Sequence, residues 1–162
     1  MTIIKINAVK NLSGYEFNAM KFGNPIRENK VSRFYVYVGR AWSNRHGRSL
    51  KASPLANLQK RDKTLSDEKL LERYSIYLNG NIRMAVDIIN CNDSDFTAYK
   101  NLDITTLKRC YDIFMEIVRI LSLCSQYNEV ILVCHCVKSE LDDQTPCHAR
   151  IIQKVIEERL CK

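Results

Sequence analysis

One short segment near the end of the chain restricts the possible folds more than any other. Residues 129–134 contain the uninterrupted apolar run Val-Ile-Leu-Val. Such a run is typical of a strand that is buried on both faces, as in a parallel sheet. Amphipathic helical patterns flank it over Thr105–Ser125 and Pro146–Leu160. A buried strand between two such helices predicts an α/β fold, in which a mostly parallel sheet is flanked by helices.

The rest of the chain contains shorter patterns. Apolar and β-branched residues predict strands over Thr2–Val9 and Phe34–Val38. A capping pattern at Ser66 predicts a helix that ends near Gly80, and Ile82–Ile89 predicts a second short helix. Residues 11–29 and 40–62 lack periodicity and are expected to form loops. The chain has 162 residues and no repeat or Ser/Gly-rich linker, so we expect a single α/β domain over residues 1–162.

Basic residues are concentrated in one part of the chain. The sequence has 25 Lys and Arg against 18 Asp and Glu, a formal net charge of +7. No acidic residue occurs between positions 33 and 61, where the basic residues are Arg33, Arg40, Arg45, Arg48, Lys51, Lys60 and Arg61. A net charge of this size can serve solubility alone. Its local concentration favours an anionic partner, such as a phosphate, a nucleotide or nucleic acid.

The end of the second predicted strand is the first candidate binding segment. Ligands of α/β sheets bind beyond the carboxyl ends of the strands. Here Gly39 stops the strand, and Arg40 is a residue type that binds phosphate or carboxylate well. Tyr37 and Trp42 are candidates to pack on a base, and Asn57 follows within Ser-Pro-Leu-Ala-Asn. The alternative is a solvated basic loop in which Trp42 covers the edge of the core.

The second candidate segment begins at the end of the buried strand. Cys134 and Cys136 are predicted to project from the same face, because side chains alternate along a strand, and His135 is predicted to face the other way. We interpret His135 as a structural histidine. Both cysteines are candidate ligand-binding residues.

A helix start completes this segment. Thr145 is a suitable N-cap and Pro146 suits the first helical position, which places Cys147 and His148 in the first turn. Free amides and the helix dipole favour an anion there, and Arg150 would add positive charge. A thiol at such a position ionises more readily than a free thiol.

Three interpretations of these sulfur residues remain open. The types of Cys134, Cys136, Cys147 and His148 suit zinc, but Cys-x-Cys on a strand is not a common zinc spacing, and we assign no metal ligand. Cys147, assisted by His148, is alternatively a reactive or ligand-contacting thiol, which makes these two the candidate catalytic residues. The third interpretation is inert, buried cysteines that pack the strand end.

The remaining cysteines and the apolar runs bear on the compartment. The cysteine count is seven, and an odd number without a predicted signal peptide over Met1–Lys10 argues against a disulfide framework. Cys110 and Cys124 are expected to be core residues. No apolar run is long enough to cross a bilayer. We therefore expect a cytoplasmic protein with no membrane partner. The helix over Thr105–Ser125 could pack in the core or in a homo-oligomer interface.

Several of these segments together resemble domain of unknown function 4326, a family of bacteria and their viruses. The matching stretches are Val36–Arg40, Ser53–Leu58, Leu71–Tyr74, Leu132–Cys136 and Cys147–His148. Ala56 and Leu58 stand where the family has Gly and Pro, and the segment between Cys136 and Cys147 is longer than usual. The family has no agreed activity, so the resemblance implies a fold and the position of a site, not a reaction.

These observations lead to one main functional prediction and two alternatives. The main prediction is that the chain binds a phosphorylated or nucleotide-like small molecule between the Gly39–Arg40 strand end and the Cys147–His148 helix start. One such role, for a phage-encoded protein, is to sequester a signalling nucleotide. The first alternative is a thiol- or histidine-dependent enzyme acting on a nucleoside or nucleotide, and the second is nucleic-acid binding through residues 33–61. No particular cofactor follows from these residues.

Overall fold

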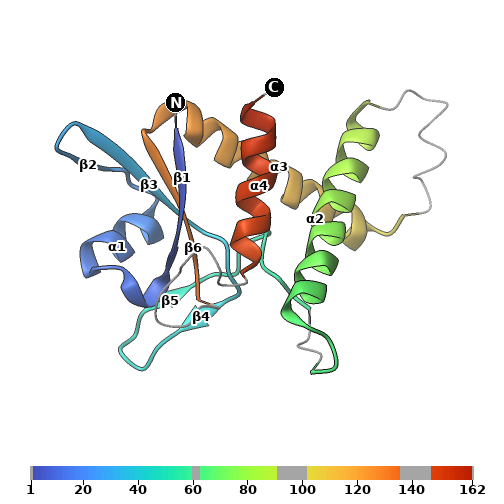
Figure 1. Cartoon of the computed structure of the whole chain (residues 1–162), viewed down its shortest axis with the longest axis horizontal. Coiled ribbons are helices and arrows are strands. Elements are labelled where there is room, and N and C mark those ends of the chain that lie inside the picture. Colours follow the sequence, from blue (N-terminus) through green and yellow to red (C-terminus); the bar gives the residue numbers. More distant parts are fainter. Residues whose placement is uncertain (1, 60–62, 91–101, 136–146, 162) are drawn as a thin grey trace.

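The computed structural model describes residues 2–59, 63–90, 102–135 and 147–161 (Figure 1). In these ranges the elements are β1 (Ile3–Ala8), the 3-10 turn η1 (Val9–Asn11), α1 (Gly14–Phe22), β2 (Ile26–Glu28), β3 (Val31–Tyr37), β4 (Trp42–Ser43), β5 (Ser49–Leu50), α2 (Asp67–Asn90), α3 (Ile104–Gln126), β6 (Glu129–Cys134) and α4 (His148–Leu160). Within these ranges, no helix combines the length and the apolar character that crossing a membrane requires.

In the described part of the chain, the main sheet has four strands in the order β1-β6-β3-β2. Strands β1 and β3 both run parallel to β6, and β2 pairs with β3 as an antiparallel edge strand. This confirms the predicted α/β fold with a mostly parallel sheet. The last strand in sequence therefore lies between two strands from the first quarter of the chain. Its position makes the carboxyl ends of β1, β3 and β6 neighbours.

The central position of β6 explains its composition. All six of its residues are buried, and Val130, Leu132, Val133 and Cys134 are fully inaccessible to solvent. Burying one such aliphatic side chain stabilises a fold by roughly 1.5–3 kcal/mol. Helices cover both faces of this strand, so polar side chains on either face would remove that stabilising contribution.

The two faces of the sheet have separate hydrophobic cores. The larger core packs α2, α3 and α4 against strand residues that include Ile4, Val36, Leu132 and Cys134. The smaller core packs α1 against Tyr35, Ile131 and Val133, with Trp42 and Tyr37 at its edge. In Figure 1, α1 lies on one side of the strands, and α4 and α2 lie on the other. Cys110 and Cys124 are buried, as predicted.

Two of the predicted loops and one predicted helix end were wrong. Residues 11–29 contain α1 and β2, because Ser13 and Glu16 form a capping box that starts a helix. The chain then leaves α1 through Gly23, whose φ of 69° suits a residue without a side chain. Helix α2 continues through Gly80 to Asn90, since packing of its buried face outweighs the cost of about 1 kcal/mol for one helical glycine. Residues 40–62 contain the short β4–β5 pair.

Candidate functional site

The two predicted segments meet at the carboxyl end of the sheet. Strand β3 ends at Tyr37, beside Val133 of β6, and the Val38 amide donates a hydrogen bond to the Val133 carbonyl over 2.8 Å. From the other segment, the His148 Nε2 atom lies 2.7 Å from the Val38 carbonyl oxygen. The end of β3, the end of β6 and the first turn of α4 are therefore in direct contact.

On the α1 side of the sheet, Tyr37 and His135 form a hydrogen-bonded pair. The Tyr37 hydroxyl lies 2.6 Å from His135 Nδ1 and 2.5 Å from the Arg40 carbonyl oxygen, and the two rings stack with centroids 6.3 Å apart. The hydroxyl has one proton, and a carbonyl oxygen can only accept. Tyr37 therefore donates to Arg40, and His135 Nδ1 donates to the Tyr37 oxygen. In the neutral imidazole, this arrangement leaves the lone pair on Nε2.

Gly39 is required for this pair to form. A Cβ atom at position 39 would lie 2.5 Å from the Tyr37 hydroxyl oxygen, 2.7 Å from Tyr37 Cζ and 2.9 Å from His135 Nδ1. Non-bonded atoms do not approach so closely, so any side chain here would displace the tyrosine or the imidazole. The glycine that ends the strand in the sequence thus provides space for two side chains from neighbouring strands.

On the opposite side of the sheet, a pair of thiols occupies the corresponding position. The sulfur atoms of Cys134 and Cys147 lie 3.1 Å apart, and both residues are buried. His148 is also buried, and its ring meets Tyr74 edge-on with centroids 5.3 Å apart. Tyr74 in turn donates a hydrogen bond to the Leu55 carbonyl over 2.6 Å. The predicted opposite orientation of Cys134 and His135 is confirmed.

Helix α4 starts later than the sequence predicts. Its N-cap is Cys147, whose extended backbone (φ −148°, ψ 136°) ends the preceding segment, and His148 is the first helical residue. The prediction that Thr145 is the N-cap was wrong for this reason. Thr145 and Cys136 lie outside the described residues. The Arg150 amide donates to the Cys147 carbonyl over 3.0 Å, within the first turn of the helix.

Arg40 holds a loop. Its guanidinium donates to the carbonyl oxygens of Asn57 and Gln59, each over 2.5 Å, while the Gly39 carbonyl accepts from the Ser53 amide over 2.9 Å. The structure therefore brings the candidate residues Arg40 and Asn57 together. Arg40 is exposed, and in the described part of the chain these bonds use its Nε and one terminal nitrogen.

Trp42 lies on the α1 side of the sheet. Its ring packs 6.0 Å from that of Phe17, and the Arg48 guanidinium carbon lies 5.1 Å from the centroid of the same phenylalanine. Trp42 is half-buried there. This position agrees with the alternative interpretation, in which Trp42 covers the edge of the core. It shares this core edge with Tyr37.

The described cysteine and histidine side chains are not arranged around a common metal position. Over residues 2–59, 63–90, 102–135 and 147–161, no three His, Cys, Asp or Glu side chains are disposed to hold a metal ion. The Nε2 atom of His148 is directed at the Val38 carbonyl instead.

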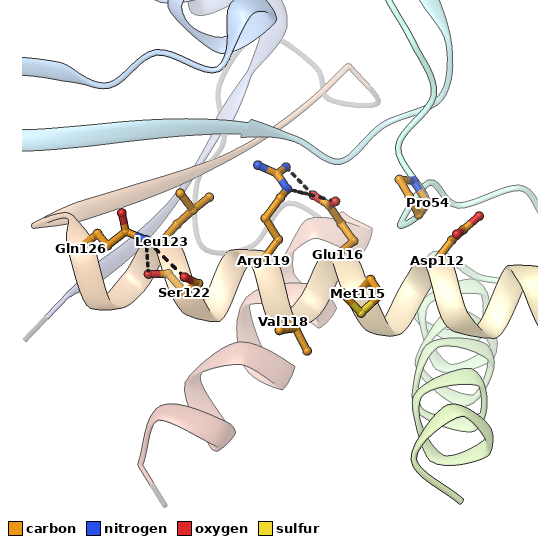
Figure 2. A pocket seen from close by; sticks show the side chains of 9 residues that line it. All are labelled: Pro54, Asp112, Met115, Glu116, Val118, Arg119, Ser122, Leu123 and Gln126. Atoms are coloured by element: carbon orange, nitrogen blue, oxygen red, sulfur yellow. Dashed lines mark hydrogen bonds and ion pairs between the residues drawn. The ribbon is translucent and has the colours of Figure 1, made fainter. Parts of the chain in front are cut away.

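A separate hollow of about 560 Å³ runs along α3. It is lined by Pro54, Asp112, Met115, Glu116, Val118, Arg119, Ser122, Leu123 and Gln126. Figure 2 shows the Arg119 guanidinium paired with the Glu116 carboxylate in this hollow. The carboxylate of Asp112 and this neutralised pair make it a poor site for an anion. It contains none of the predicted site residues.

Comparisons of this chain with protein-family models, with curated proteins and with solved structures found no match. The resemblance to domain of unknown function 4326 therefore stays a prediction.

Proposed function

We propose that the carboxyl end of the sheet binds a phosphorylated, nucleotide-like small molecule. The observation that supports this most directly is the contact between the two segments, through the His148–Val38 and Tyr37–His135 pairs. In parallel sheets this end is where ligands bind. The His148–Val38 contact also brings the start of α4, with its positive dipole end, to the end of β3.

The chemistry around this end suits an anion with an aromatic group. Arg40, Arg45, Arg48 and Lys51 all lie exposed in the segment that follows β3. Guanidinium groups bind phosphate oxygens in a fixed fork geometry. Tyr37, His135 and Trp42 provide aromatic surface on the α1 side, next to the same segment.

An enzymatic role for Cys147 and His148 stays a prediction. Both side chains are buried, and their described contacts are with Cys134, Val38 and Tyr74. Binding requires only the charge and shape of this end of the sheet, so it is the function that the geometry supports better.

A thermal-shift screen tests the proposal. The purified protein is heated with inorganic phosphate and with nucleoside mono-, di- and triphosphates. A ligand that binds only the folded state raises the melting temperature as its concentration increases. We expect at least one nucleotide to do so at low ionic strength, and more strongly than phosphate alone. If none of these probes shifts the transition, the proposal is wrong.

Two arginine variants locate the site. Arg40→Ala removes one charged donor and loosens the loop that it holds, so we expect the nucleotide affinity to fall about 10–100-fold. Arg83→Ala removes the same charge from an exposed position on α2 and is the matched control, for which we expect the affinity to stay within about twofold. An equal loss of nucleotide affinity in the two variants would indicate a general effect of charge and would contradict a site at Arg40.

A further inference from the structure

The geometry points to Cys134 and Cys147 as a dithiol modification site, which a small peroxide converts into an intramolecular disulfide. Their sulfur atoms are 3.1 Å apart, closer than two sulfurs in ordinary van der Waals contact. A disulfide bond is about 2.05 Å long, so closing the bond requires a movement of roughly 1 Å. The two sulfur atoms are in contact but not bonded to each other in the structure.

The positions of the two residues give the bond a structural consequence. Cys134 is the last residue of β6, and Cys147 is the N-cap of α4. The bond would therefore close residues 134–147 into a ring and fix the start of α4 to the end of the central strand. Such a ring restricts the unfolded chain more than the folded one, which stabilises the fold.

Both thiols are buried, so an oxidant that reaches them must be small. Hydrogen peroxide meets this requirement. One sulfur attacks the O–O bond and becomes a sulfenic acid, and the first water leaves. The second thiol attacks that sulfur, the S–S bond forms, and the hydroxyl leaves with the thiol proton as a second water. Two thiols are oxidised and one peroxide is reduced to two waters.

Other cysteines of the chain provide internal comparisons. Cys124 is buried, as Cys134 and Cys147 are, and burial raises the pKa of its thiol to about 11. The Cys110 thiol donates to the Leu107 carbonyl in its own helix. Cys161 is exposed near the chain end and is free to react alone. In the described residues, only Cys134 and Cys147 have their sulfurs in mutual contact.

The experiment uses a variant that keeps this pair and removes the cysteines able to compete with it. In the triple variant Cys91→Ser, Cys136→Ser and Cys161→Ser, peroxide treatment is followed by alkylation under denaturing conditions and mass spectrometry. We expect a loss of two hydrogen atoms, two fewer alkylated thiols, and a cross-link between tryptic peptides 120–138 and 139–150. Dithiothreitol should reverse all three changes.

Two further measurements make the result specific. Cys124 lies in the same tryptic peptide as Cys134, so the cross-linked peptides alone do not show which of the two cysteines has reacted. Adding Cys124→Ser to the triple variant should leave the cross-link intact. The oxidised triple variant should melt roughly 5–10 °C above its reduced form. The proposal is overturned if the folded triple variant forms no cross-link, or if the cross-link disappears with Cys124→Ser.

Discussion

The Nε2 atom of His148 lies 2.7 Å from the carbonyl oxygen of Val38, although the two residues are 110 positions apart. Val38 is fully buried and His148 is 5% exposed, so this hydrogen bond has little contact with water. It joins the start of α4 to the end of β3. The proposed binding site depends on this connection, because it positions the two segments against each other.

Replacing His148 with alanine should therefore destabilise the fold. The substitution removes the donor to a buried carbonyl and leaves a cavity beside Tyr74. We expect the free energy of unfolding to fall by about 2–4 kcal/mol. Urea denaturation followed by circular dichroism measures this change. His46→Ala, on the exposed β4–β5 turn, is the matched control and should change it by less than about 0.5 kcal/mol. Similar effects of the two substitutions would contradict a structural role for the His148–Val38 bond.

A methyl group at Gly39 should also destabilise the fold, through overpacking. The Gly39→Ala side chain would enter the space of the Tyr37 hydroxyl and the His135 ring, so we expect a loss of about 1–3 kcal/mol. Gly80→Ala gives the opposite expectation. Position 80 is exposed within α2, and among the described residues no atom outside its own helix backbone and chain neighbours lies within 4 Å of the added carbon, so helix propensity should increase the stability by roughly 0.5–1 kcal/mol. Thermal unfolding of the two variants shows whether each substitution raises or lowers the stability. Stabilisation by Gly39→Ala would contradict the close contacts of Gly39 with Tyr37 and His135.

The Tyr37 hydroxyl should determine which nitrogen of His135 carries the proton. In the native protein Nδ1 donates to the Tyr37 oxygen, so the neutral ring should be protonated at Nδ1. Tyr37→Phe removes that acceptor, and we expect the proton to shift towards Nε2. Nitrogen NMR of the imidazole at a pH where the ring is neutral distinguishes the two forms. The exposed His46 should give the same spectrum in both proteins. An unchanged His135 tautomer in Tyr37→Phe would show that other contacts set it.

The sequence predicts the three parallel strands β1, β3 and β6, which have strong local patterns, and misses the short edge strand β2. The predicted strand over residues 129–134 has the same bounds as β6, and the helix expected over Thr105–Ser125 differs from α3 by one residue at each end. The first segment is an uninterrupted apolar run, and the second has an unbroken helical period of apolar residues. Helix α1 was missed because its buried residues, Phe17, Ala19 and Met20, form only a short stripe.

The candidate site is predictable in position and less so in detail. The expectation that the strand end near Gly39 meets the helix start near Cys147 follows from a general rule for parallel sheets. The partners of individual side chains depend on loop conformation, which no local pattern encodes. Arg40 illustrates this: its residue type suggests a phosphate contact, whereas its guanidinium bonds to the carbonyls of Asn57 and Gln59. The signal that could have indicated the Tyr37–His135 pair is the glycine two residues after the tyrosine.

At the opposite end of the sheet, Glu129 should make the stability depend on acid. Lys5 Nζ donates to its carboxylate over 2.8 Å and Arg33 Nε over 2.7 Å, and these bonds lower the pKa of Glu129 below its usual value of 4.5, with the lysine contributing most. The unfolded chain therefore binds a proton at this carboxyl at a higher pH than the folded chain. Stability from Glu129 is fully present above about pH 4.5 and is lost as the pH falls further.

Glu129→Gln should remove this contribution. We expect the variant to be less stable than the native protein by about 1 kcal/mol near pH 7, because two cations lose their partner. The difference between the two proteins should shrink as the pH falls below about 4.5 and the native carboxyl takes up its proton. Urea denaturation over a series of pH values from neutral downwards measures it. Glu158→Gln, on the exposed face of α4, is the control and should leave the pH dependence unchanged. A Glu129→Gln variant whose deficit stays constant across this range would show that the side chain acts through packing, because only a charge interaction disappears when the carboxylate takes up its proton.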